Sequence, residues 1–164
     1  MYTVHRQLLS IGRDYRVENA AGETVFKIDG KVRFARTFLV RDANGQRLLR
    51  VREKLWSLQH AFLIDRDGQL LARLHRTTFA SDRHARYEIE MDGVRVMEAS
   101  GDLFRESVRL NREDGLHVGS VSRKQHAMVH ESFYMNVVSE EDQALGLALL
   151  MAIVESTTDR GEDE

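Results

Sequence analysis

Apolar and polar residues alternate along most of the chain, and short polar clusters that end in glycine interrupt the alternation at regular intervals. In the segment Phe26–Asp29, for example, apolar and polar side chains take turns. Such alternation is typical of a strand with one face buried and one face in water. Counting the alternating segments predicts twelve strands, at residues 3–11, 13–19, 23–29, 32–41, 46–53, 57–65, 69–76, 84–91, 94–100, 102–110, 116–123 and 126–138.

The glycines of the polar clusters show how these strands are connected. They are separated by 23, 23, 25 and 22 residues, at Gly22, Gly45, Gly68, Gly93 and Gly115. Asn-Gly and Asp-Gly pairs among them tolerate the positive φ that tight hairpin turns require. A period near 23 residues is too long for one strand and fits two strands with their connections. The repeating unit is therefore predicted to be a β-hairpin.

The pattern changes at Ser139, where a helix is predicted over about 140–157. Ser139 is suited to the N-cap, and the acidic residues after it place Asp142 at the third helical position. Residues 144–154 are apolar on every side of such a helix, so other side chains must surround it. The last residues, 159–164, form a charged tail that we expect to be disordered.

Together these elements predict a mainly β fold, a closed twelve-stranded antiparallel barrel that encloses the C-terminal helix. A barrel of this size is wider than its own side chains can fill, and only the apolar helix can occupy the extra space. Residues 1–158 would then form a single domain. With the helix in the interior, we expect little room for a substrate cavity.

Composition and charge narrow the class of protein. The 164 residues are 42% hydrophobic and 30% charged with a net charge of −2, which indicates a globular domain without general affinity for polyanions. The absence of cysteine excludes disulfides and thiolate chemistry and fits a reducing compartment. The N-terminus lacks the apolar core of a signal peptide, and the longest apolar run, Leu145–Val154, is ten residues where a membrane span needs about 20. We predict a cytoplasmic protein with no transmembrane segment, and the oligomeric state stays open.

Several segments, taken in their order along the chain, resemble a known family. They are Phe26–Lys31, Phe38–Gly45 with Leu48–Lys54, Asp67–Arg76, and Asp142–Leu145 at the start of the apolar helix. Over about residues 5–155 the chain resembles the LURP-one-related family of the tubby C-terminal-like superfamily, which also includes the phospholipid scramblases. The resemblance implies a twelve-stranded barrel around a central helix. From the tubby-like members it also implies binding of phosphoinositide headgroups at membranes, and it implies no catalytic motif.

Basic residues on the strands that flank Gly45 and Gly68 are the candidate binding site. Arg50, Arg52 and Lys54 are spaced two apart, so they share one face, which we expect to be the outer one. Arg73 would project outward on a nearby strand, with Arg76 near its end. As a positive patch these residues would bind phosphate headgroups, with about 1 kcal/mol from each Lys or Arg. Alternatively, they are the ordinary solvated face of a barrel, where strand charges discourage edge pairing.

The sequence gives weaker support for a metal site or a catalytic site. On a strand His126 and His130 would lie about 13 Å apart, too far to share one metal ion at about 2 Å, and His60 alternates with apolar residues as a packing histidine would. Arginines around Arg86 and Arg95 are explained by cross-strand ion pairs with nearby glutamates. No Gly-x-Ser-x-Gly, His-Glu-x-x-His or phosphate-loop motif is present.

We therefore predict no enzymatic activity, metal, cofactor or nucleic-acid binding. The leading hypothesis is a binding module that associates reversibly with anionic phospholipid headgroups. The competing hypothesis is a protein-interaction or scaffold module with no role for lipid.

Overall fold

In the part of the chain that the computed structural model describes, twelve strands and one helix follow one another in the order that the sequence predicts. The residues it describes are 1–7, 13–32, 36–54, 61–77, 84–103, 107–124, 132–138 and 142–158. The elements are β1 (Tyr2–Gln7), β2 (Asp14–Glu18), β3 (Thr24–Val32), β4 (Arg36–Asp42), β5 (Arg47–Lys54), β6 (Ala61–Arg66), β7 (Gln69–Arg76), β8 (Ala85–Met91), β9 (Val94–Gly101), β10 (Val108–Arg112), β11 (His117–Arg123), β12 (Ser132–Val137) and α1 (Gln143–Thr158). The prediction of twelve strands is confirmed.

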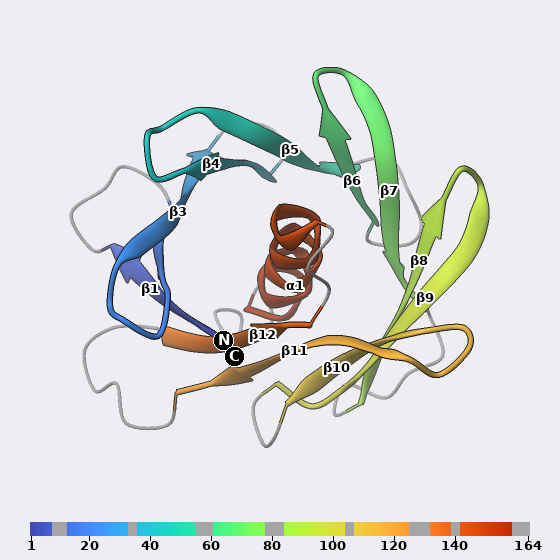
Figure 1. The fold of residues 1–164 in the computed structure, drawn as a ribbon. Coiled ribbons are helices and arrows are strands. Elements are labelled where there is room, and N and C mark those ends of the chain that lie inside the picture. The colour runs from blue at the N-terminus through green and yellow to red at the C-terminus, as the bar shows by residue number, and fades with distance from the viewer. Residues whose placement is uncertain are drawn as a thin grey trace.

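The strands form one closed antiparallel barrel (Figure 1). Each strand pairs with its neighbours in the chain, and β1 closes the ring by pairing with β12, with Val4 opposite Phe133. Closure removes the open edges that a sheet of twelve strands would otherwise expose. The fold class predicted from alternation and turn spacing is therefore confirmed.

Five tight turns lie at one rim of the barrel, because each joins an even-numbered strand to the next odd-numbered one. The turn between β6 and β7 shows why the sequence bends there. Asp67 has φ 51° and Gly68 has φ 86°, so both residues adopt the left-handed conformation of a two-residue hairpin turn. Asp92 and Gly93 repeat this geometry, with φ 51° and 77°. The hairpin predicted from the glycine period is thus present.

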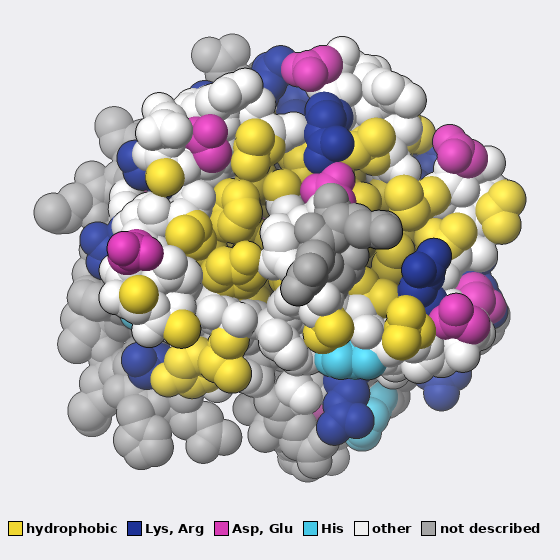
Figure 2. Space-filling model, viewed as in Figure 1, with side chains coloured by type: hydrophobic (Ala, Val, Ile, Leu, Met, Phe, Trp, Pro, Cys, Tyr) yellow, Lys and Arg dark blue, Asp and Glu magenta, His cyan; other side chains and the backbone are white. Residues whose placement is uncertain are grey.

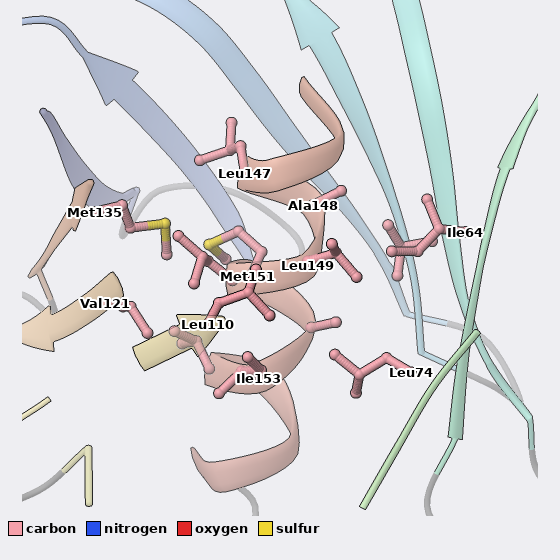
Figure 3. Packing of buried hydrophobic residues seen from close by; sticks show 14 of the residues in the cluster. Ile64, Leu74, Leu110, Val121, Met135, Leu147, Ala148, Leu149, Met151 and Ile153 are labelled. Carbon is pink, nitrogen blue, oxygen red and sulfur yellow. The ribbon is translucent and has the colours of Figure 1, made fainter. Parts of the chain in front are cut away.

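The helix α1 passes through the interior of the barrel (Figure 1). From Leu147 to Val154 every side chain is at most 1% exposed. Strand side chains surround it, and Figure 3 labels five of them, Met135, Val121, Leu110, Ile64 and Leu74. In the face shown in Figure 2, hydrophobic side chains occupy the middle of the molecule and charged ones lie around them. Among the described residues, no helix has the length and apolarity that a bilayer crossing requires.

The start of α1 differs from the prediction. The helix begins at Gln143, and Asp142 precedes it instead of occupying its third position. The Asp142 Oδ1 atom accepts a hydrogen bond of 2.9 Å from the backbone N–H of Leu145, which is the geometry of an N-cap. The predicted role of Asp142 was wrong because its short carboxylate serves the free N–H groups better from outside the helix than from within it. Ser139 lies outside the described residues.

Candidate functional site

The five predicted headgroup residues lie on two strands that β6 separates. On β5, Leu49 and Val51 are buried while Arg52 and Lys54 are exposed and Arg50 is half-buried. On β7, Arg73 is exposed and Arg76 is half-buried, whereas the residues on either side of Arg73 are buried. The alternation therefore places Arg50, Arg52, Lys54 and Arg73 on the outer face, as expected. Arg76 instead belongs to the inner row of β7, where it lies opposite the buried Tyr87.

Pairing with β6 brings the two sets of basic residues close together. Arg52 lies opposite Leu63, and Leu63 lies opposite Arg73 on its other side. Two steps across a sheet correspond to about 10 Å between backbones, which long arginine side chains can span. Arg52 and Arg73 therefore flank the same position of the outer face.

A single carboxylate neutralises part of this charge. The Arg50 Nε atom donates to both oxygens of Asp65, at 3.2 and 3.0 Å, and the Arg52 Nε atom lies 3.4 Å from Oδ2 of the same residue. The Asp65 side chain is only 5% exposed, so the two guanidinium groups cover it. On the neighbouring strand β8, a carboxylate oxygen of Glu90 lies 3.8 Å from Arg73. Two arginines against one aspartate leave a local excess of positive charge.

Among the arginines around Arg86 and Arg95, Arg95 forms ion pairs with two glutamates. Arg95 contacts Glu88 at 3.1 Å and Glu113 at 2.6 Å. Hydrogen bonds to Glu113 and then to Glu88 raise the pKa of the Arg95 guanidinium above its ordinary value. The His75 Nε2 atom also lies 3.2 Å from Glu88. Cross-strand pairing therefore accounts for Arg95, as the sequence indicated.

The histidines singled out for a metal site, His126 and His130, lie outside the described residues, as does His60. Within the described ranges, no three His, Asp or Glu side chains converge in a way that could hold a metal ion.

A second polar cluster, which the sequence analysis missed, lies inside the barrel near the C-terminal end of α1. Its centre is Glu155, which is 4% exposed. The Tyr15 hydroxyl donates to Oε1 at 2.8 Å, and Arg13 Nη1 donates to Oε2 at 3.2 Å. Arg36 Nη1 donates at 2.8 Å to the backbone carbonyl of Glu155. The three donor side chains thus bind both the buried carboxylate of Glu155 and its backbone carbonyl in the last turns of the helix.

Strand alternation explains why these arginines face inward. Arg13 lies two residues before the buried Tyr15 and Arg36 two residues before the buried Phe38, so both continue the inner face to the rim. Gly30 of β3 lies on the same inner row. A Cβ atom there would be 2.5 Å from the carbonyl oxygen of Arg13, so only glycine permits the close approach. Their positions two residues before core residues were the sequence signal that could have identified both arginines.

The cluster forms part of the wall of a cavity of about 190 Å³ between α1 and strands β2 to β4. Apolar side chains form much of the remaining wall; the lining includes Arg13, Tyr15, Ile28, Arg36, Phe38, Met151 and Glu155. The helix thus leaves a small cavity at this end, below the roughly 300 to 1,000 Å³ of pockets that enclose drug-sized ligands. The inner row here contains a glycine, and its arginines reach toward the helix backbone instead of packing as apolar side chains would.

Comparisons with known proteins agree with the fold. The model of the LURP-one-related family matches residues 1–154. An X-ray structure of a protein from Arabidopsis thaliana is similar with a TM-score of 0.65, at 17% sequence identity over 96% of this chain and 92% of that chain. A likeness at this identity shows the fold alone. No functionally curated protein matches the chain.

Proposed function

The chain belongs to the LURP-one-related family, and from this premise we propose that it is a non-enzymatic binding module that associates reversibly with anionic phospholipid headgroups. The site is the outer basic face, defined as Arg50, Arg52, Lys54 and Arg73; Arg76, in the inner row of β7, is not part of it. The observation that carries the proposal is the sharing of Asp65 by Arg50 and Arg52, at 3.0 and 3.4 Å, which leaves positive charge uncompensated on the surface.

Exposure and spacing support contact with a flat anionic surface. The side chains of Arg52 and Arg73 are 44% and 45% exposed, so each guanidinium can meet a phosphate without leaving a buried position. Each such contact contributes about 1 kcal/mol near an anionic membrane. Three exposed cations on the outer basic face therefore give weak, reversible and salt-sensitive association, because surface charges are screened over about 8 Å at physiological ionic strength.

Vesicle sedimentation tests this proposal. The test variant replaces Arg52, Lys54 and Arg73 by Ser and keeps Arg50, because Arg50 holds the buried Asp65. The control variant replaces Arg109, Arg112 and Arg123 by Ser; these are exposed residues of β10 and β11. Each variant loses three positive charges, so the two variants differ only in the surface from which the charges are removed.

We expect the natural protein to sediment with phosphatidylcholine vesicles that contain phosphatidylserine or a phosphoinositide, and less so at physiological salt. The test variant should lose most of this binding while the control variant keeps it. Failure of the natural protein to bind these vesicles, or equal loss in both variants, would contradict the proposal.

A protein partner is the second candidate, and a groove between two hairpins favours it. Strands β7 and β8 pair only over Arg73–Arg76 and Tyr87–Glu90, and beyond this point the hairpins β6–β7 and β8–β9 separate (Figure 1). The groove has a volume of about 270 Å³, and Leu70 in its wall is 45% exposed. If this groove binds a partner, Leu70→Glu should abolish recovery of that partner from native lysate, whereas Leu116→Glu at another exposed turn should not.

A further inference from the structure

We propose that the groove between β7 and β8 binds an extended peptide segment whose side chains are alternately apolar and basic, and which pairs with β7 as an added strand. The inference rests on the second candidate function, a protein partner at this groove, and adds the chemistry of that partner. Headgroup binding by the outer basic face is a separate property, which vesicle sedimentation tests without the peptide.

One edge of β7 has no neighbouring strand in the described part of the chain. Residues 69–72 lie beside β6, with one register shift, whereas pairing with β8 begins only at Arg73, which lies opposite Glu90. Figure 1 shows the hairpins β6–β7 and β8–β9 diverging beyond this pair. An uncovered strand edge offers N–H and C=O groups to an extended chain. Four residues of strand span about 13 Å, so a short segment of the partner is sufficient to cover the edge.

The β7 side of the groove is apolar. Leu70, Leu71 and Ala72 line it, and Leu70 is 45% exposed while Ala72 is 1% exposed. Because successive side chains of a strand point to opposite faces, every second side chain of an added strand would point toward the barrel interior beside Ala72. Met91, at the end of β8 across the groove, is half-buried and packs against the core. Apolar side chains fit these inward positions, since apolar groups surround them.

The charge of the groove favours basic side chains at the outward positions. Arg73 and Glu90 lie 3.8 Å apart and offset each other. Asp92 also lines the groove and is exposed, and among the described residues it has no cationic partner. A lysine or arginine between Leu70 and Asp92 would pack its apolar stem on the first and bring its charge to the second. The groove therefore matches a segment in which apolar and basic residues alternate.

Two other occupants match this surface less well. A second copy of the chain would bring the same edge, and residues 69–72 contain no lysine or arginine to meet Asp92. An anionic bilayer has no backbone groups to pair with β7, and its surface charge has the same sign as Asp92. The peptide is the occupant for which the strand edge, the apolar side chains and the carboxylate all find partners.

The experiment adds the peptide acetyl-Lys-Val-Lys-Val-Lys-Val-amide to the full chain and follows methyl resonances by NMR. We expect this probe to shift the resonances of Leu70 and Ala72 and to leave that of Leu39, on the outer face of β4, unchanged. Three comparison peptides replace Lys by Glu, group all Lys before all Val, or carry methyl groups on the backbone nitrogens. Each should bind at least about tenfold more weakly, because it lacks the charge, the alternation or the donors of a strand ladder.

Two matched double variants test the role of the carboxylates. Glu90→Gln with Asp92→Asn removes two negative charges from the groove, and asparagine tolerates the φ of 51° at residue 92. Glu23→Gln with Asp42→Asn removes two negative charges near the turns β2–β3 and β4–β5 and leaves the groove as it is. The first variant should weaken probe binding about three- to tenfold, and the second should leave it unchanged. Melting curves without the probe check that both variants are folded.

A probe that leaves Leu70 and Ala72 unmoved would overturn the inference, and so would a comparison peptide that binds as well as the probe, or equal weakening by the two variants. Shifts at Leu70 on concentrating the chain alone would assign the edge to a second copy and would also overturn it. The second candidate function is judged separately. If Leu70→Glu abolishes recovery of a lysate partner although the probe does not bind, the groove binds a protein and only the proposed peptide chemistry is wrong.

Discussion

The two ends of α1 use polar residues in opposite ways. At the N-terminal end, Asp142 caps the helix and pairs with Arg66 at 2.7 Å, with the two side chains 31% and 44% exposed. At the C-terminal end, Glu155 is 4% exposed and is held by Arg13 and Tyr15 inside the barrel. Polar groups at the first end can exchange protein partners for water. Those at the second end cannot, so each bond lost there leaves a buried group unsatisfied.

The helix dipole adds to this difference between the two ends. A carboxylate before the first turn is favoured by the positive end of the dipole, as with Asp142, whereas one in the last turns meets its negative end. Glu155 is in that unfavourable position, and the two inward arginines offset it, Arg13 at the carboxylate and Arg36 at the carbonyl. Residues that break a local rule and need compensation nearby are expected at functional sites. The cavity beside Glu155 lies at this end of the helix.

The largest expected effect concerns the apolar core that both ends share. Leu149 lies between them and is 1% exposed, so Leu149→Asp places a carboxylate where no partner can reach it. We expect this variant, like removal of the residues after Gln143, to be insoluble or to lose cooperative unfolding in urea. Leu149→Ala should instead lose about 2 to 5 kcal/mol.

Leu116→Asp is the control for that change, because Leu116 is 59% exposed. Its unfolding free energy should stay within about 0.5 kcal/mol of the natural protein. A soluble, cooperatively unfolding chain without residues after Gln143 would show that the helix does not hold the barrel together.

The next effect tests the buried end. Glu155→Ala should lower the free energy of unfolding by about 2 to 4 kcal/mol, because it removes the acceptor of Tyr15 and leaves Arg13 facing the interior. Glu155→Gln keeps an acceptor for the hydroxyl and should lose less. Urea denaturation measures both. If Glu155→Ala costs no more than the loss of the cap at the other end, the contrast between the two ends is wrong.

The cap itself gives a smaller effect. Asp142→Ala should destabilise by about 1 kcal/mol, since it leaves the N–H of Leu145 without its acceptor. Asp142→Asn keeps the acceptor and loses only the ion pair with Arg66, which is exposed and contributes about 0 to 1 kcal/mol. Thermal unfolding of the two variants separates the cap from the ion pair, and equal destabilisation would assign the whole effect to Arg66.

The contrast also explains which parts of the molecule the sequence predicts. The barrel follows from alternation and turn residues, as at Asp67 and Gly68, because both signals are local and recur in every hairpin. The central position of α1 follows from its lack of a polar face. These inferences need no knowledge of which distant residues meet.

Predicting the polar cluster around Glu155 would have required knowing which distant residues meet. Arg13 lies just before β2, Arg36 begins β4 and Glu155 lies in α1. The bond between Arg13 and Glu155 joins residues 142 apart in the chain. Alternation indicates that the two arginines face inward, yet it does not show that they meet the same helical turn or that Gly30 leaves the wall open beside them. The shared Asp65 was missed for the same reason, because strand register places it opposite Arg50 and within 3.4 Å of Arg52.

The smallest effects come from matched tyrosines at the two ends. The Tyr2 hydroxyl donates to Gln143 at 2.6 Å, and burial raises the pKa of Tyr2 above its ordinary value. At neutral pH, Tyr2→Phe should cost about 0.5 kcal/mol and Tyr15→Phe about 1 to 3 kcal/mol, because only the latter deprives a buried carboxylate of a donor.

Alkaline pH gives Tyr2 a separate signature. Since its folded-state pKa is raised, the unfolded chain loses the phenolic proton first, and the stability that neutral Tyr2 contributes falls as pH rises through the folded-state pKa. The difference in unfolding free energy between the natural protein and Tyr2→Phe should therefore shrink, and can reverse, between pH 8 and about pH 11, above the ordinary tyrosine pKa of about 10. Urea denaturation of both proteins at the two pH values measures this. A difference that grows with pH would mean that the surroundings of Tyr2 favour the phenolate, and that the N-terminal end of α1 is more polar than its contacts indicate.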